Sequence, residues 1–449
     1  MVDEHDSGIE LPTTPIHRIT KPIERFMHVE AAGGVVLVAC TVAALVLANI
    51  PATADWFVGI WKTKLTIGVG GFQMSHPLYH WINDGLMAIL FFAVGLEVKR
   101  EVVLGELKET SKAALPIAAA LGGMVVPAAV YLGFQWNGEA PNGWGIPMAT
   151  DIAFVVGCMA VLGKRVPRSL RVLLLSLAIV DDIGAVLVIA IAYTEKIDFT
   201  ALVIGILAIG VITLIARLGV RSLLVYVVLG AGVWLAFHES GVHATIAGVT
   251  LGLLTPTSAH LRKSTFEAVL DRASEVFRGG EWDRMSHRAQ KIARFKKAAQ
   301  ETVSPVEYLE GVLHPWTAFV IIPVFALANA GVPISLGDFA NPIAIAVGAG
   351  LLIGKPLGIF AFAMGAVKLG LARLPDGVTA TAILGGGALA GIGFTMAMFI
   401  AGLAFKGSPE TLDAAKVGIL GASALSAALG MGILLAVLKK PDEQAKPED

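Results

Sequence analysis

Two adjacent aspartates lie in the middle of a strongly apolar stretch of the sequence. Asp181 and Asp182 interrupt the run 172–192, which is long enough to cross the ~30 Å hydrocarbon core of a bilayer. A charged side chain at that depth costs about 3 to 10 kcal/mol or more, so each carboxylate needs water, a cation or a counter-charge. A structural bond to hydroxyls of a neighbouring helix would suit one isolated aspartate better than two at mid-span. Because successive helical residues point about 100° apart, we expect one aspartate to line an ion pathway and the other to pair with another helix.

Three more polar side chains lie in apolar stretches. Thr150 and Asp151 follow a proline and several glycines in a short segment, which predicts a broken or re-entrant helix that offers oxygen ligands. Lys355 lies too far from both ends of its segment to reach the membrane surface, so it needs a carboxylate partner. The glycine-dense stretch 385–395 predicts either close helix packing or a second unwound segment.

The composition shows what class of protein holds these polar residues in position. Of 449 residues, 55% are hydrophobic and only 15% are charged, which indicates a polytopic membrane protein and excludes a soluble globule. Cys40 and Cys158 both lie in apolar runs, so no disulfide framework is expected. The apolar segments predict an all-α fold with about twelve spans, at 31–50, 79–98, 113–134, 146–163, 169–193, 199–216, 221–237, 241–254, 306–331, 342–371, 378–405 and 412–438.

The loop charges predict the orientation of these spans. An even number of spans places both termini on one side, and the loops at 99–112, 164–171 and 217–221 are rich in Lys and Arg. Positive loops stay in the cytoplasm, so both termini are expected there. The domain prediction is a cytoplasmic tail at 1–28, one transmembrane transporter domain at 29–438 and a second cytoplasmic tail at 439–449.

Two loops and one further aspartate carry separate predictions. The stretch 62–78, on the outer side, alternates around several glycines and predicts a β-hairpin that could form a homodimer contact. The charged cytoplasmic loop at about 255–305 is expected to be helical and to lie against anionic lipid headgroups, with no nucleic-acid partner. Asp84, near the outer end of the second span, is expected to cap it.

The interrupted spans occupy matching places in two halves of the chain. Spans three to five and ten to twelve form two triplets, and the middle member of each, span 4 or span 11, is the broken one. Matching interruptions predict inverted three-helix repeats, in which the two broken helices cross and form a binding site near the middle of the membrane.

Several stretches carry a resemblance to one family. They are 83–88, 94–101, 149–154, 177–185, 240–245, 313–316, 328–332, 354–358 and 391–396. Together they resemble the NhaA family of bacterial sodium/proton antiporters, which is itself a standard example of an inverted-repeat transporter. The resemblance implies a pH-regulated, electrogenic secondary transporter, not an enzyme, in the bacterial inner membrane. It would export Na⁺, and also Li⁺, in exchange for external protons by alternating access, without a cofactor, and so serve sodium and pH homeostasis.

The resemblance also implies roles for individual residues. Asp181 and Asp182 would bind the cation and the protons, with Asp182 as the main ligand of the transported Na⁺. Thr150 and Asp151 would compensate the facing ends of the broken helices, and Lys355 would pair with Asp181. A second set of positions resembles those linked to pH response, namely Glu97, His243 and Glu310. The connection at 255–305 is longer than in compact members, which affects the expected pH threshold rather than the transport chemistry.

The same residues suggest a mechanism and leave three alternatives. Na⁺, favoured by hard oxygen ligands, and protons would compete for the same carboxylates, and alternating access would turn this competition into exchange. An intramembrane aspartyl protease could use Asp151 with Asp182, but the sequence lacks a Gly-x-Gly-Asp element. A passive cation channel would need a ring of carbonyls or charges at several sites. A sodium-coupled symporter differs in moving an organic solute as well.

Overall fold

The computed structural model describes residues 30–69, 72–194, 197–220, 223–259 and 301–438, with a few isolated positions between them. The expected tails at 1–28 and 439–449, and nearly all of the loop from 260 to 300, lie outside the described residues. Within the described ranges the chain is almost entirely helical, as the apolar segments predict.

Each of the twelve expected spans corresponds to a helix or to an interrupted helix. Those formed by one main helix are α2 (Glu30–Asn49), α6 (Thr110–Gln135), α8 (Arg168–Ala192), α9 (Phe199–Arg217), α10 (Leu223–Glu239), α11 (Ala244–Leu254) and α20 (Pro409–Val437). The other five spans contain a change of helix type or a break. The second consists of α4 (Leu78–His80), η2 (Trp81–Leu86) and α5 (Met87–Val103), and the fourth of η4 (Pro141–Met148) and α7 (Ile152–Leu162). The ninth consists of α14 (Pro305–Trp316), η7 (Thr317–Ile321) and α15 (Ile322–Asn329), the tenth of α16 (Pro342–Ala349), η9 (Gly350–Gly354) and α17 (Lys355–Lys368), and the eleventh of α18 (Ala380–Ala390) and α19 (Phe394–Ala404).

The protein is a multi-pass helical membrane protein. Among the described residues, eight helical segments are long and apolar enough to cross a membrane, and the bent pair α18–α19 makes up to nine. The helices α5, α10 and α11 are shorter, with 17, 17 and 11 residues. The expected number of twelve crossings and the inverted symmetry of the repeats therefore stay predictions.

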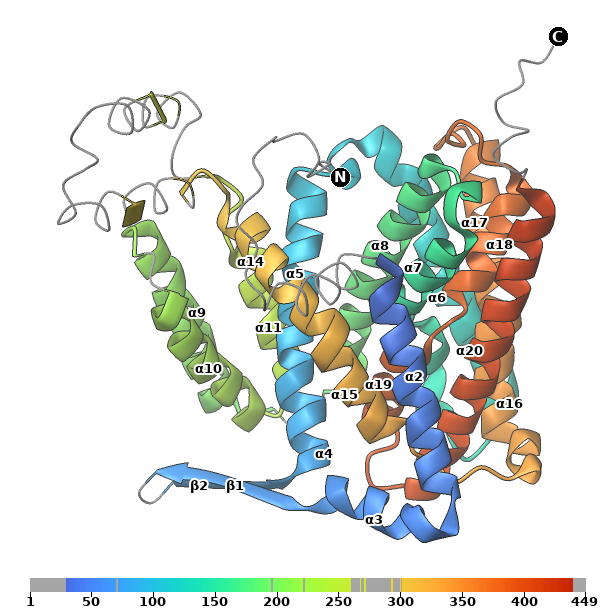
Figure 1. Cartoon of the computed structure of the whole chain (residues 1–449), viewed down its shortest axis with the longest axis horizontal. Coiled ribbons are helices and arrows are strands. Elements are labelled where there is room, and N and C mark those ends of the chain that lie inside the picture. Colours follow the sequence, from blue (N-terminus) through green and yellow to red (C-terminus); the bar gives the residue numbers. More distant parts are fainter. Residues whose placement is uncertain are drawn as a thin grey trace, which may run out of the picture.

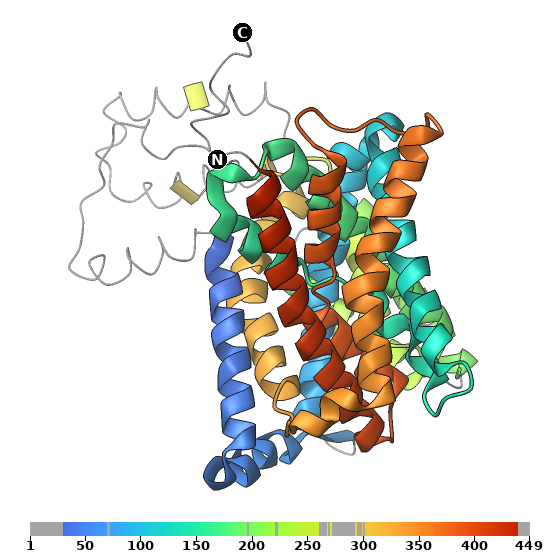
Figure 2. The same ribbon diagram turned by 90° about the vertical axis from the view of Figure 1, so that its right-hand side faces the viewer.

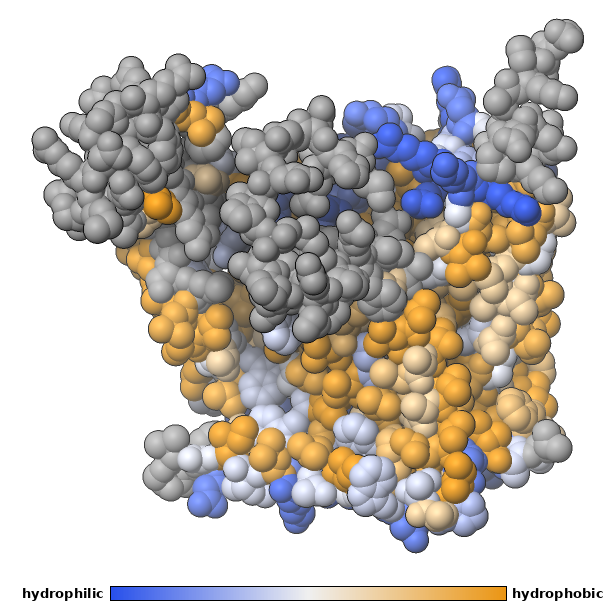
Figure 3. All heavy atoms as spheres, viewed as in Figure 1, coloured by the Kyte–Doolittle hydropathy of each residue, from blue (hydrophilic) through white to orange (hydrophobic). Residues whose placement is uncertain are grey.

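The helices run side by side, and the molecule has two distinct ends. Helix α2 begins and α20 finishes at the same end, whereas the hairpin and the short helix α3 (Pro51–Lys62) lie at the other (Figures 1 and 2). Hydrophobic residues gather in a band between these ends, where more hydrophilic residues appear (Figure 3). The described ends of the first and last spans thus share one side, as the sequence predicts.

The predicted hairpin is confirmed. Strands β1 (Lys64–Val69) and β2 (Phe72–Pro77) pair antiparallel, from Lys64 opposite Pro77 to Val69 opposite Phe72. The hydroxyls of Thr66 and Ser75 form a cross-strand hydrogen bond of 2.7 Å. Helix α3, which joins α2 to this hairpin, was not expected from the sequence.

Glycines bring α6 and α17 into backbone contact. A Cβ atom on Gly122 of α6 would collide with the carbonyl of Gly358 on α17, and the reverse substitution would collide in the same way. In the preceding turn, η9, a Cβ atom on Gly354 would collide with Pro127 of α6, and one on Gly350 would collide with Pro147 of η4. The π-helical turn η9 ends just before Lys355, whose side chain is fully buried in the interior of the bundle.

Candidate functional site

The two broken spans meet at their interruptions. In the first, η4 is followed by the non-helical residues 149–151 and then by α7. In the second, α18 and α19 are separated by residues 391–393 and bent by 50°. The backbone N–H of Asp151 donates to the carbonyl of Ile392 at 2.7 Å, so one break is hydrogen-bonded to the other. The expected interruption of spans 4 and 11 is confirmed.

Asp151 lies between the amino-terminal ends of two helices. Its carboxylate accepts from the backbone N–H of Phe154 at 3.2 Å and thereby caps α7. Its other oxygen accepts from the N–H of Thr395 at 3.0 Å and from the Thr395 hydroxyl at 2.5 Å, in the first turn of α19. Helix amino termini carry partial positive charge and free N–H groups, so a single buried carboxylate satisfies both.

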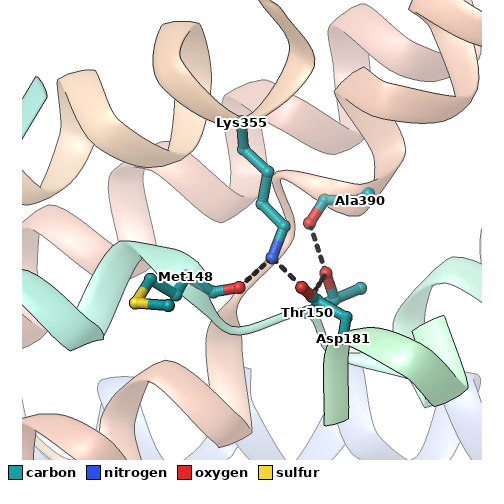
Figure 4. A network of polar contacts seen from close by, with 5 residues as sticks. All are labelled: Met148, Thr150, Asp181, Lys355 and Ala390. Atoms are coloured by element: carbon teal, nitrogen blue, oxygen red, sulfur yellow. Dashed lines mark hydrogen bonds and ion pairs between the residues drawn. The ribbon is translucent and has the colours of Figure 1, made fainter. Parts of the chain in front are cut away.

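The opposite ends of the two breaks receive hydrogen-bond donors (Figure 4). Lys355 donates to the carbonyl of Met148, the last residue of η4. The hydroxyl of Thr150 lies 3.0 Å from the carbonyl of Ala390, the last residue of α18. Carboxyl-terminal helix ends carry partial negative charge, so a cation and a hydroxyl suit them.

Asp181 connects these groups to α8. Its Oδ2 accepts from Lys355 Nζ at 2.7 Å and from the Thr150 hydroxyl at 2.6 Å. Lys355 is fully buried and Asp181 is 1% exposed, so this is an ion pair away from water. Removing one partner of such a pair typically costs about 3 to 5 kcal/mol, because the other charge stays buried alone. The partner that the sequence predicts for Lys355 is therefore present.

Asp182 differs sharply from its neighbour. It is 4% exposed, yet its side chain makes no hydrogen bond or ion pair with any described residue. The second oxygen of Asp181, Oδ1, is also buried without a hydrogen-bond partner among them. The two adjacent carboxylates thus offer unused oxygen atoms, which in a membrane interior need a proton, a cation or water.

Comparison with known proteins identifies the family to which this chain belongs. A family model described as Na⁺/H⁺ antiporter 1 matches residues 24–434. The Na⁺/H⁺ antiporter NhaA of Rhodopirellula baltica is 54% identical over 439 residues, which cover 98% of this chain and 99% of the relative. That of Rhizobium meliloti is 47% identical over 440 residues, with 98% and 100% covered.

This chain belongs to the NhaA family of Na⁺/H⁺ antiporters. The resemblance that the sequence motifs carry is confirmed. Membership makes the protein a multi-pass inner-membrane transporter rather than an enzyme, with Na⁺ and H⁺ as its substrates. The aspartyl protease alternative is thereby set aside. The finer roles of individual residues rest on the geometry and are taken up below.

A cavity of about 430 Å³ is lined in part by the connection between α5 and α6, which lies at the end of the bundle where α2 begins (Figure 1). Its walls include Glu97 and Arg100 of α5 and Ser176 and Ile179 of α8. These two α8 residues precede Asp182 by six and three positions, or about 9 and 5 Å along the helix axis. In this NhaA-family protein the cavity therefore extends from that end toward the aspartate pair.

The three residues linked by resemblance to pH response do not lie together. Glu97 lines the cavity, and Glu310 of α14 forms an ion pair of 2.6 Å with Arg100. His243 instead lies near the hairpin end, where its Nε2 is 2.6 Å from the carbonyl oxygen of Tyr193. Glu97 and Glu310 therefore both lie near Arg100 at the cavity, whereas His243 lies at the other end of the bundle.

Sequence reasoning missed several parts of the NhaA-family site. The carbonyls of Met148 and Ala390 take part through the backbone, which side-chain types do not reveal. Thr395 was visible in a glycine-rich motif, but its bond to Asp151 depends on how the breaks meet. The expectation that Asp84 caps its span is wrong, because Asp84 lies within η2 and pairs with His80 one turn earlier.

Proposed function

We propose that this protein exports Na⁺, and also Li⁺, in exchange for external protons at Asp181 and Asp182. One observation carries the proposal: Asp182 is buried at mid-span without a partner among the described residues, beside a carboxylate that does have one. A buried carboxylate in this position is neutralised either by a proton or by a cation, and the choice between them is the competition that exchange requires.

The ligand types favour a hard cation. Asp182 and Asp181 Oδ1 supply unused carboxylate oxygens, and the buried hydroxyl oxygen of Thr150, in the neighbouring break, lies 2.6 Å from Asp181 Oδ2. Alkali cations prefer such oxygen ligands to nitrogen or sulfur. Asp182 is the main ligand in this proposal, and Asp181 contributes once its bond to Lys355 loosens.

The Asp181–Lys355 ion pair gives the empty site a stable form. With the pair closed, the cationic lysine neutralises Asp181 and supports the carboxyl-terminal end of η4. In this proposal more protons than Na⁺ ions move in each cycle, as the resemblance implies, so each cycle moves net charge and the membrane potential assists Na⁺ export. Asp151 and Thr150 hold the helix ends in place while the site changes its occupant.

Access alternates between the two sides in this proposal. The loop charges favour a cytoplasmic location for the end where α2 begins, which is also the end with the cavity at Glu97 and Ser176. Movement of the broken helices against the other spans would close this route and open one from the outside. The glutamates at the cavity mouth, Glu97 and Glu310, are placed to make entry depend on cytoplasmic pH.

The hairpin is the proposed contact of a homodimer. Leu65 and Ile67 of β1 are 43% and 53% exposed, and a two-stranded sheet leaves both of its edges open. Pairing of residues 62–78 with those of a second copy would cover these side chains and edges.

The experiment that tests the exchange site uses everted membrane vesicles with a fluorescent ΔpH dye. Addition of Na⁺ is expected to collapse ΔpH in the wild type and to have no effect with Asp182→Asn. The matched control is Asp55→Asn, because Asp55 is exposed on α3. Collapse that persists in Asp182→Asn would exclude this site. Na⁺ flux that needs no proton gradient would favour the channel, and Na⁺ flux that requires an organic solute would favour the symporter.

A further inference from the structure

Three histidines from distant parts of the chain meet at the hairpin end. His76 lies in β2, His80 in α4 and His238 near the end of α10. The ring centroids are 4.3 Å apart for His76 and His80, 5.8 Å for His76 and His238 and 5.6 Å for His80 and His238. One ring nitrogen from each lies within 4.8 Å of those of the other two.

Asp84 supplies a fourth potential ligand. It lies four residues after His80 and so on the same helical face, and its Oδ2 is 3.1 Å from His80 Nε2. The same oxygen is 3.9 Å from His238 Nδ1. Although His80 Nε2 is close to this carboxylate, the atom is buried and makes no hydrogen bond of acceptable geometry among the described residues. The 3.1 Å between this nitrogen and this oxygen is close to the spacing of about 3.3 Å between two ligands of one tetrahedral Zn²⁺ ion.

Aromatic side chains hold the cluster in place. Trp234 stacks on His238, with centroids 5.5 Å apart and planes 12° from parallel, and its Nε1 donates to the carbonyl of Asp84 at 3.2 Å. Trp81 stacks on Trp234 in turn and donates from its own Nε1 to the Leu65 carbonyl of β1 at 3.1 Å. The hairpin, the start of the second span and α10 are thus already connected around the histidines. A prearranged set of ligands loses little conformational entropy when an ion binds.

We propose that His76, His80, His238 and Asp84 form a binding site for one divalent transition-metal ion of the Zn²⁺ class. Three imidazoles and one carboxylate are a usual tetrahedral Zn²⁺ ligand set, whereas Na⁺ and Mg²⁺ prefer oxygen ligands only. Zn–N bonds of about 2.0 to 2.1 Å place tetrahedral nitrogens about 3.3 Å apart, so the rings close inward by small side-chain rotations. His80, His238 and Asp84 are between 18% and 34% exposed, which leaves the site open to ions.

Other charges near the cluster are consistent with a single ion. The positive charge of Lys406, after α19, acts on His80 and opposes a second cation, while Asp84 neutralises part of the first. A bound ion would add a further link between β2, the start of the second span and α10, which ring contacts and the hydrogen bonds of Trp81 and Trp234 already connect. This site lies at the opposite end of the second span from the cavity, since Glu97 follows His80 by 17 residues, or about 25 Å of helix.

The test is metal titration of the purified full-length protein in detergent, after removal of any affinity tag. Co²⁺ as a Zn²⁺ substitute is expected to give an intense visible absorption band typical of tetrahedral coordination, saturating at one ion per chain and abolished by added Zn²⁺. Single variants His76→Gln, His80→Gln and His238→Gln are expected to weaken Co²⁺ binding at least about 100-fold, because the loss of a ligand exceeds the loss of a supporting residue. The matched control, His314→Gln on the exposed surface of α14, is expected to bind as the wild type.

Two results would overturn the proposal. One is the absence of a tetrahedral Co²⁺ band in the wild type. The other is equal Co²⁺ affinity in the wild type and in the three histidine variants. Thermal unfolding without metal shows which variants are folded. If a histidine substitution disrupts the fold, Asp84→Asn serves instead, because it replaces only one carboxylate oxygen by an amide nitrogen. Because the readout is metal binding, it is independent of Na⁺/H⁺ exchange.

Discussion

The site at the crossing of the broken helices and the histidine cluster at the hairpin end gather polar groups in opposite ways. At the crossing, Asp181, Asp182 and Lys355 are at most 4% exposed, and the available ligands are oxygens. At the hairpin end, imidazole nitrogens predominate, and the side chains are partly open to solvent. A buried oxygen site needs a protein movement to exchange its ion, whereas an open nitrogen site does not. In the two proposals, burial and ligand type thus distinguish the transported Na⁺ from a retained metal ion.

The largest expected effect is that a variant at either site loses the activity of that site and keeps the activity of the other. Asp182→Asn should reduce Na⁺/H⁺ exchange at least about 100-fold, equivalent to about 2.7 kcal/mol, because it removes the charged ligand. His238→Gln should leave the exchange rate within about twofold of the wild type, since it lies far from the crossing. Co²⁺ binding should show the reverse pattern. Vesicle ΔpH assays and Co²⁺ absorption on the same variants check this, and parallel losses of both activities would break the distinction.

Within the crossing, the paired and unpaired aspartates should differ in their contribution to stability. Asp181→Asn leaves Lys355 buried without its counter-charge and should lower the free energy of unfolding by about 3 to 5 kcal/mol. Asp182→Asn removes a group without a described partner and should cost less than about 1 kcal/mol. Thermal unfolding in detergent compares the two. Equal losses would mean that Asp182 has a stabilising partner after all.

Lys355 itself should matter more for stability than for exchange. Lys355→Ala removes the cation that holds Asp181 in the empty state and should destabilise the protein by about 3 kcal/mol or more. If the pair is a resting arrangement rather than a step of transport, exchange at its best pH should stay within about tenfold of the wild type, or about 1.4 kcal/mol. The measurement is exchange in everted vesicles across a pH series. A folded Lys355→Ala protein without exchange at any pH would contradict this role.

The smallest effect is expected at the cavity mouth. Glu310→Gln breaks a partly exposed ion pair with Arg100, which should cost no more than about 1 kcal/mol of stability. The pH dependence of exchange should nevertheless change, because a titratable group is lost from the neighbourhood of Glu97, while the maximal rate should be retained. Vesicle assays over a pH series test this, with Glu410→Gln on the exposed first turn of α20 as the control. An unchanged pH profile would remove Glu310 from the pH response.

The sequence predicts the positions of the spans well because apolar length and polar interruptions are local properties. The hairpin and the two breaks were predicted from glycine and proline for the same reason. The pairing of Lys355 with an aspartate follows from the cost of a lone buried charge, although the choice of Asp181 rather than Asp182 came only from resemblance.

Contacts between distant segments could not be predicted in this way. The bonds of Asp151 to Thr395 and of Lys355 to the Met148 carbonyl depend on how two breaks meet in space. The approach of His238 to His76 and His80 joins residues more than 150 positions apart, and no local pattern marks it. Helix α3 was missed because it has only 12 residues and a mixed composition, so neither its length nor its hydropathy marks it.

The central claim, that Na⁺ and protons compete for the same buried carboxylates, is tested most directly by calorimetric titration of the purified protein with Na⁺. Titrations at several pH values, in buffers of different ionisation enthalpy, count the protons released on binding. The account predicts that Na⁺ binding releases protons. It also predicts that the apparent Na⁺ affinity falls as the pH is lowered, by up to about tenfold per pH unit for each proton released. Na⁺ binding that releases no protons and keeps the same affinity at every pH would contradict it.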